Sequence, residues 1–412
     1  MSKAVLLKCS GNEEIQIKVE QAISMLGGIR KYVKPGNRVL IKPNVLCAQN
    51  YTTGATTNPL LVKAVADLCL EAGAEKIIVG ESSNWGIDSM AAMLACGYEN
   101  IADGEKVILQ DLKKQPFVEK KIKGLVLSEI FVPEVIEKAD VVINCPVLKT
   151  HTMTKVTIGI KNLSVGISSD MDKQHRLHHI GIYPAITDEM EKHGSWLDCA
   201  IADINAHVKT TLTVVDGILG LHGMGAPLFG VPVHSKLILA GDDRVTVDAV
   251  GSRILGFDAN EVYHIRNSYE YGMGEIELEK IEILGEPLEN FKFQIHQSYH
   301  PSLENIPSNV KVIDGCGTCK ACLSTAAYVM NRHREDIEKM GIPIYVYIGK
   351  NFKDKKMKPE RAMHIYYGNC AGSHIYGGGF VPGCPPRSRR QFIQAIGALD
   401  IYRQDEGLDT DR

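Results

Sequence analysis

The sequence lacks three features that would tie it to an exported, membrane or nucleic-acid-binding class. No apolar run approaches the roughly 20 residues that span a bilayer. The opening MSKAVLLKCS contains no basic segment before a long apolar one and no small-residue cleavage site. The formal net charge of −3 argues against nucleic acid as the main partner. We therefore expect a cytoplasmic protein with no membrane span.

Short β-branched runs alternate with helical stretches as far as about residue 260. A helix is predicted from Asn58, a good N-cap, through Pro59 at its first position to a stop at Gly73. Alternation of this kind predicts an α/β fold with a mostly parallel, Rossmann-like sheet of buried strands and helices on both faces. The predicted strands, all of which we expect to be buried and parallel, occupy residues 38–42, 76–80, 140–144, 212–216 and 236–240.

The length of 412 residues allows two or three domains. We assign residues 1–261 to the α/β domain and residues 262–312, with a strand at 280–284, to an edge strand and linker. Residues 313–412 form a small C-terminal, cysteine-rich α/β segment, in which a strand is predicted at 344–348.

Five of the eleven cysteines lie in that last segment. Paired cysteines two residues apart let one tight turn offer two thiolates, and glycines and prolines surround the distal cysteines. Four thiolates are needed for a 4Fe-4S cluster, so the pattern predicts an iron–sulphur site with one spare thiol. The candidate ligands are Cys316, Cys319, Cys322, Cys370 and Cys384.

Two other uses of these cysteines are less favoured. A structural zinc site typically adds a second CxxC or a paired histidine, whereas here the later cysteines stand singly. A disulfide framework needs an oxidising compartment, and nothing in the sequence directs the chain to one. The two-cluster ferredoxin pattern is also absent, because Leu323 and the residues after it replace the expected Cys-Pro.

Ligands of parallel α/β sheets bind at the carboxyl edge, so residues that follow the strands are the site candidates. Lys42 and Asn44 flank a proline after the strand at 38–42, and a Thr/Gly-rich stretch at 51–57 follows them. This stretch could hold an anion, but it matches no specific phosphate loop, so an ordinary loop is an equal alternative.

The segment after the strand at 140–144 carries Lys149, His151, Lys161 and Asn162. Lys149 and His151 occupy alternate positions of an extended segment and would face the same side, where they could hold one anionic group. A histidine near its ordinary pKa could also carry a proton there. The alternative is a solvated basic face, which is less favoured because apolar residues interleave with the cations.

Other candidates carry weaker signals. His175 and His178 belong to a histidine cluster that could ligate a metal or contact a carboxylate, although adjacent histidines point different ways. Asp216 ends the strand at 212–216, and Gly223 and Gly225 allow close backbone approach to a ligand without forming a dinucleotide fingerprint.

Several blocks taken together resemble a known family. KPN at 42–44, LKTHTMTKVTIGIKN at 148–162, VVDG followed by GMGAP, and AGDDRVTVDAVG at 240–251 are similar in order and spacing to the iron–sulphur-centre proteins grouped as domain of unknown function 362. The resemblance extends from about residue 37 to 257. It implies a C-terminal cluster-binding segment, in which Cys319, Cys322, Cys370 and Cys384 match best and Cys316 is extra.

The leading functional hypothesis is an oxidoreductase in which one 4Fe-4S cluster passes electrons to or from a small anionic substrate or cofactor. Lys42, Lys149, His151 and Lys161 would hold and protonate that molecule. No nicotinamide or flavin motif is present, so a ferredoxin or another redox protein is the expected electron partner. The candidate cofactor contacts are Asn44, Asn162, His175, His178, Asp216, Gly223 and Gly225.

Two alternatives stay open. The cluster could be structural or act as a Lewis acid in a non-redox isomerase or lyase, for which the α/β half compares with nickel-dependent racemases by fold type only. The protein could instead be a cluster carrier or assembly factor, in which Cys316 helps to hand the cluster on. Two-fold homodimers are the commonest oligomers, and we expect one here.

Overall fold

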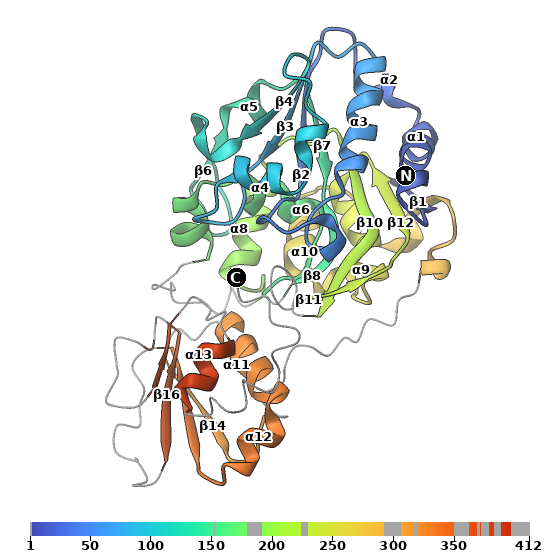
Figure 1. The fold of residues 1–412 in the computed structure, drawn as a ribbon. Coiled ribbons are helices and arrows are strands. Elements are labelled where there is room, and N and C mark those ends of the chain that lie inside the picture. Colours follow the sequence, from blue (N-terminus) through green and yellow to red (C-terminus); the bar gives the residue numbers. More distant parts are fainter. Residues whose placement is uncertain are drawn as a thin grey trace. The chain divides into compact units, whose positions relative to one another are not determined.

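In the computed structural model, the chain consists of two compact units (Figure 1). The first unit comprises residues 1–178 and 185–296, and the second comprises residues 179–184 and 297–412. The structure describes residues 2–151, 153–178, 192–223, 230–291, 306–315, 320–349, 362–368, 371, 379–382 and 389–396.

A mixed, mainly parallel sheet forms the centre of the first unit. Its main path runs in the order β13 (Ile281–Gly285), β1 (Ser2–Lys8), β12 (Leu237–Gly241), β10 (Leu212–Gly223), β7 (Val141–Cys145), β2 (Arg38–Pro43), β3 (Lys76–Glu81) and β4 (Val107–Asp111). The sheet is extended beside β10 by β8 (Val147–His151), β9 (Lys155–Thr157) and β11 (Gly230–Val233). A separate hairpin consists of β5 (Phe117–Lys121) and β6 (Glu129–Pro133).

Helices cover both faces of this sheet, as predicted. One core contains side chains from α1 (Ile15–Met25), α2 (Ile29–Tyr32), α3 (Pro59–Glu71) and α4 (Ser89–Ala95). The other contains side chains from α5 (Glu134–Lys138), α6 (Gly159–Asn162), α8 (Trp196–Asn205), α9 (Arg244–Ile254) and α10 (Tyr263–Glu270). Successive strand residues point to opposite faces, so Leu40 joins the second core whereas Val39 and Ile41 join the first.

The predicted helix start and stop are confirmed in α3. The Asn58 side chain accepts a hydrogen bond from the Leu60 amide at 3.0 Å, and Pro59 occupies the first turn. Gly73 follows the helix with a φ of 96°, a conformation that favours glycine. These local signals therefore determined the boundaries of the helix.

The prediction that the strand at 236–240 runs parallel to its neighbours is wrong. β12 is antiparallel both to β10 and to β1. The reason lies in the connection, because β11 already returns antiparallel along β10, with Gly223 opposite Gly230. A parallel crossover needs a dozen or more residues, usually with a helix, and this hairpin does not provide it.

The edge strand predicted at 280–284 is confirmed, since β13 ends the path and pairs parallel with β1.

The second unit is a smaller α/β structure. Its four described strands are all parallel and run in the order β14 (Val310–Asp314), β15 (Ile344–Ile348), β16 (Met363–Tyr367) and β17 (Gly379–Val381). An apolar core joins these strands to α11 (Lys320–Arg332), α12 (Arg334–Lys339) and α13 (Arg389–Ala395). Within the described ranges of both units, no helix is long and apolar enough to cross a membrane.

Candidate functional site

A buried ion pair lies where the parallel strands β2 and β3 end. Lys42 Nζ is 2.7 Å from Glu81 Oε1, and both side chains are almost completely buried. The same amine donates to the carbonyl of Pro43 at 2.6 Å and to Asn162 Oδ1 at 3.3 Å. Burial lowers the pKa of Lys42, whereas Glu81 opposes that shift. All three lysine donors have acceptors, so Lys42 organises the site and has no donor left for a ligand.

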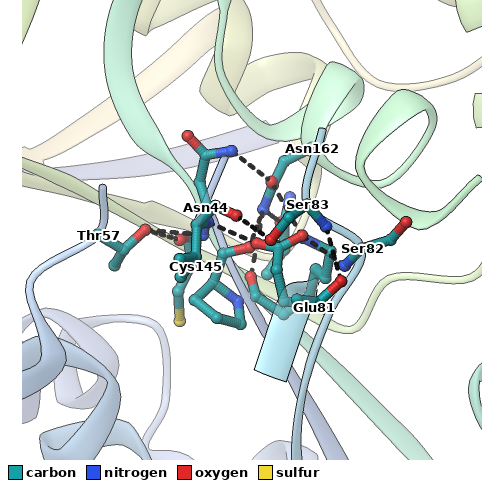
Figure 2. Close-up of polar contacts among 12 residues, drawn as sticks. Asn44, Thr57, Glu81, Ser82, Ser83, Cys145 and Asn162 are labelled. Carbon is teal, nitrogen blue, oxygen red and sulfur yellow. Dashed lines mark hydrogen bonds and ion pairs between the residues drawn. The ribbon is translucent and has the colours of Figure 1, made fainter. Parts of the chain in front are cut away.

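Glu81 also connects the loops that leave the two strands. Its Oε2 accepts the amide of Val45 at 2.5 Å, and its Oε1 accepts the amide of Ser82 at 2.6 Å. Figure 2 shows Glu81 among these contacts, with Ser82 and Ser83 beside it. The two backbone amides and the Lys42 amine together satisfy the buried charge of the Glu81 carboxylate.

Asn162 joins β2, β7 and α6. Its amide nitrogen donates to the carbonyl of Pro43 at 3.1 Å and to Asn144 Oδ1 at 2.8 Å. Its oxygen accepts from Lys42 and from Asn44 Nδ2, each at 3.3 Å (Figure 2). Two asparagines predicted as ligand contacts, Asn44 and Asn162, are therefore brought together with Lys42.

Lys149 lies on β8 and is buried against neutral oxygens. It donates to Asn44 Oδ1 and to the carbonyl of Ala55, the latter at 3.1 Å. Burial lowers the pKa of Lys149 to about 8. An amine with this pKa changes its charge close to neutral pH, which is the range in which proton transfer is efficient.

Lys161 and His151 meet through Thr154. Lys161 Nζ donates to Thr154 Oγ1 at 3.2 Å, and the same hydroxyl lies 3.2 Å from His151 Nδ1. Burial lowers the pKa of Lys161 well below its usual value. Burial and the Lys161 charge also lower the pKa of His151 well below its usual range. His151 is therefore a neutral imidazole, not the group of ordinary pKa that we expected.

Lys173 belongs to the same buried set but was missed in the sequence. It lies in the π-helical turn Asp172–Leu177 and donates to Ser82 O, Ser82 Oγ and Ser83 O, each at 2.6 Å. Burial lowers its pKa to about 7. No motif marks Lys173, whereas Glu81 stands directly after a predicted strand and could have been weighed as a strand-end carboxylate.

Asp248 holds the turn that carries Lys161 and Asn162. From α9, its carboxylate accepts the amides of Gly159 at 2.7 Å and Ile160 at 2.9 Å. A Cβ atom at Gly159 would come within 2.9 Å of Asp248 Oδ1, so only glycine fits without a shift. Burial raises the pKa of Asp248 to about 7, although the two amide bonds oppose this.

Two further predicted positions have structural contacts. Asp216 accepts the amides of Asn58 at 2.7 Å and Ile218 at 3.1 Å, and burial raises its pKa to about 6. It thereby ties the start of α3 to β10. The strand runs on to Gly223, so the prediction that it ends at Asp216 is wrong. Gly223 ends β10, and its carbonyl accepts Thr150 Oγ1 at 2.9 Å. Gly225 lies outside the described residues.

The two histidines of the cluster differ in their surroundings. His178 Nδ1 lies 2.7 Å from the Lys173 carbonyl, and its ring meets Trp85 edge-on, with centroids 5.4 Å apart. His175 is exposed. In the part of the chain that the structure describes, no group of three or more His, Cys, Asp or Glu side chains is placed to hold a metal.

One of the candidate cluster cysteines is described. Cys322 is buried in α11 and belongs to the core of the second unit. The other four, Cys316, Cys319, Cys370 and Cys384, lie outside the described residues.

A family model matches part of the first unit. The family described as "Domain of unknown function (DUF362)" matches residues 39–253, which include all the lysines and asparagines described above. A thylakoid-associated protein, sll1697, of Synechocystis sp. is 29% identical over 235 residues, or 57% of this chain and 67% of that protein.

Two solved structures are similar at low TM-scores. One is a protein from Thermotoga maritima, at 16% identity and a TM-score of 0.33 over 55% of each chain. The other is the lactate racemase apoprotein from Thermoanaerobacterium thermosaccharolyticum, at 11% identity and a TM-score of 0.36. That match covers 83% of this chain and 68% of the racemase.

Replacing Lys42 should leave Glu81 as an unpaired buried carboxylate. We expect Lys42→Met to lower the free energy of unfolding by about 3–5 kcal/mol, the usual cost of removing one partner of a buried ion pair. The double variant Lys42→Met/Glu81→Gln should recover much of this loss. Urea unfolding followed by circular dichroism measures both, and equal loss in the single and double variants would contradict the role of the pair.

The raised pKa of Asp248 predicts a pH-dependent contribution to stability. The neutral carboxyl is favoured in the folded protein, so Asp248 adds to the free energy of unfolding below pH 3.8. This contribution is lost as the pH rises towards about 7. This loss is on the order of 4 kcal/mol. Asp248→Asn cannot titrate, so its free energy of unfolding relative to the wild type should rise between pH 4 and 7. Parallel pH profiles for the two proteins would show that Asp248 does not titrate in this range.

Proposed function

This chain belongs to the DUF362 family, and we propose that it is an iron–sulphur oxidoreductase that binds a small anionic substrate at the carboxyl edge of its larger sheet. One observation carries the substrate part of the proposal. Lys149 and Lys161 are both buried, and their hydrogen-bond acceptors within the described residues are neutral oxygens. A buried ammonium without a counter-charge costs several kcal/mol, and a bound anion would supply that charge.

The same amines are suited to proton transfer. The lowered pKa of Lys149, about 8, allows both its protonated and its neutral form near neutral pH, so this amine could donate or accept a proton at the bound anion. Burial also lowers the pKa of Lys161, which favours its neutral form. His151, a neutral imidazole beside Thr154, would serve as a further hydrogen-bonding group. Lys42 would act through Asn44 and Asn162, which it holds in place.

Strand direction in the second unit supports a common site for the cysteines. β14, β16 and β17 are parallel members of one sheet, so their carboxyl ends lie at one edge. Each of the three cysteine-bearing stretches follows one of these strands in the sequence. Cys322 shares a core with Tyr367 and Val381, the last residues of β16 and β17. Thiolates gathered at this edge would fit a 4Fe-4S cluster, which supplies one electron at a time.

The proposal also includes a location and an electron partner. It places the protein in the cytoplasm, where thiols stay reduced, with a ferredoxin or a similar redox protein as electron partner. A second candidate, an isomerase or lyase that uses the lysines alone, is favoured by the same lowered pKa values, because proton transfer needs no electron.

The cluster is tested by metal and acid-labile sulphide analysis of protein purified without oxygen. We expect about four irons and four sulphides per chain and an electron paramagnetic resonance signal that changes on reduction with dithionite. Cys384→Ser should lose the visible absorption, whereas Cys47→Ser, a change in the larger unit, should keep it. Zinc without sulphide would contradict the redox proposal and favour the isomerase or lyase.

The anion site is tested by thermal unfolding with a panel of small carboxylates and phosphates at constant ionic strength. A ligand at a hundredfold excess over its Kd stabilises the folded state by about 2.7 kcal/mol, which raises Tm by several degrees. Lys149→Met should abolish this rise. Lys155→Met should keep it, because Lys155 is partly exposed on the same hairpin and is paired with Glu261 at 3.4 Å. If no anion in the panel changes Tm, the proposed site is wrong.

A further inference from the structure

We propose that His151 is a hydrogen-bond donor of fixed tautomer, whose Nε2–H binds an unprotonated oxygen of the ligand together with Thr157 and Lys149. The proposal rests on the anion-binding function proposed above and specifies the atoms that hold the anion. The ligand chemistry is an oxyanion, which either a carboxylate or a phosphate supplies. His151 then keeps its proton, in contrast to the proton carrier that the sequence suggested.

Backbone amides decide which ring nitrogen of His151 carries the proton. The amide of Met153 donates to His151 Nδ1 at 3.1 Å, and the amide of Thr154 lies 3.4 Å from the same nitrogen. A backbone amide only donates, so Nδ1 is the acceptor and the single proton of the neutral ring is on Nε2. The Thr154 hydroxyl, 3.2 Å from Nδ1, can donate to it as well.

The surroundings of His151 oppose a second proton. A proton on Nδ1 would face the N–H of Met153, so an imidazolium would set two donors against each other. Burial is the largest cause of its lowered pKa. The charged groups that lower this pKa further are all basic, namely Lys161, His178, Lys149 and His264. Within the described ranges, no carboxylate pairs with His151. The ring is therefore neutral.

The Nε2–H of His151 is left for a ligand. Every hydrogen bond that His151 makes within the described ranges involves Nδ1. The two nitrogens lie on different sides of the ring, so the Nε2–H points away from the amides of Met153 and Thr154. The side chain is half-buried, and a polar group in such a position usually has a partner. A ligand oxygen would supply one.

The register of the β8–β9 pair brings two more donors to the same face. Lys149 and His151 are two residues apart on β8, so their side chains leave one face of the strand about 7 Å apart. Thr157 on β9 lies directly opposite Lys149, and its buried hydroxyl has no partner among the described atoms. Lys149 uses two of its three donors, on Asn44 and Ala55.

These donors select an oxygen that bears no proton. The imidazole and ammonium N–H groups only donate, and a hydroxyl on the ligand would set its own proton against them. A carboxylate or phosphate oxygen accepts from all three groups. Because His151 donates without losing its proton, proton transfer is left to Lys149, whose pKa of about 8 suits it.

Nuclear magnetic resonance tests the tautomer without any ligand. Two-bond proton–nitrogen spectra of the full-length protein, labelled with nitrogen-15 histidine, distinguish the two neutral tautomers and the imidazolium. The signals that disappear in His151→Gln assign the residue. We expect the Nε2–H tautomer from about pH 6 to about pH 9, across the range in which an ordinary histidine titrates. An Nδ1–H tautomer, or an imidazolium at the lower pH, would overturn the inference.

Paired substitutions test the contact with the ligand. Calorimetric titration with acetate and with inorganic phosphate shows which oxyanion the wild type prefers. His151→Phe keeps a ring but has no donor, so the affinity for that anion should fall at least about tenfold. His151→Gln places an amide N–H close to the position of Nε2 and should retain most of the affinity. Equal losses in the two variants would contradict the donor role.

The other positions of the β8–β9 pair complete the test. Thr157→Val should also weaken binding about tenfold, whereas Lys155→Met should bind as the wild type does. Circular dichroism checks that each variant is folded. Unchanged affinity in both His151→Phe and Thr157→Val would overturn the inference and leave the anion site in place. If neither anion binds the wild type, the proposed site itself is wrong, and the spectra still decide the tautomer of His151.

Discussion

The buried Lys42–Glu81 ion pair is the interaction on which the arrangement of the site depends. It joins the ends of two adjacent parallel strands, and each partner extends the network, Lys42 through Asn162 and Glu81 through the loop amides. A buried pair is a weak source of net stability, because desolvation offsets much of the attraction. Its contribution is geometric, because Lys42 also donates to Asn162, which in turn accepts a hydrogen bond from Asn44. Asn44 in turn accepts a hydrogen bond from Lys149.

The remaining lysines differ from Lys42 in the chemistry of their surroundings. Lys42 has a carboxylate, whereas Lys149, Lys161 and Lys173 donate to hydroxyl, amide and carbonyl oxygens. Neutral oxygens do not balance a buried charge, so desolvation dominates and lowers the pKa of each amine. Such perturbed groups are typical of functional sites. The site thus combines one lysine that has a carboxylate counter-ion with several amines whose acceptors are neutral oxygens.

Local patterns predicted the elements well but not their directions or partners. The β-branched runs and the Asn58-Pro59 start of α3 depend on neighbours in sequence, and both are present as predicted. β12 was assigned the wrong direction, because direction depends on whether the connection is a hairpin or a crossover. Lys173 was missed because its acceptors, Ser82 and Ser83, lie about ninety residues away in the chain.

The amino-acid sequence by itself determined the α/β class, the boundaries of α3 and the segments that form strands, since periodicity, caps and turns act over a few residues. It also singled out Lys42 and Asn44, and the segment after the strand at 140–144 that carries Lys149, Lys161 and Asn162. Only the tertiary structure decided which lysine received a carboxylate and which were buried against neutral oxygens. Burial and pairing are set by segments far apart in the chain, and together they determine the shift in the pKa of each amine.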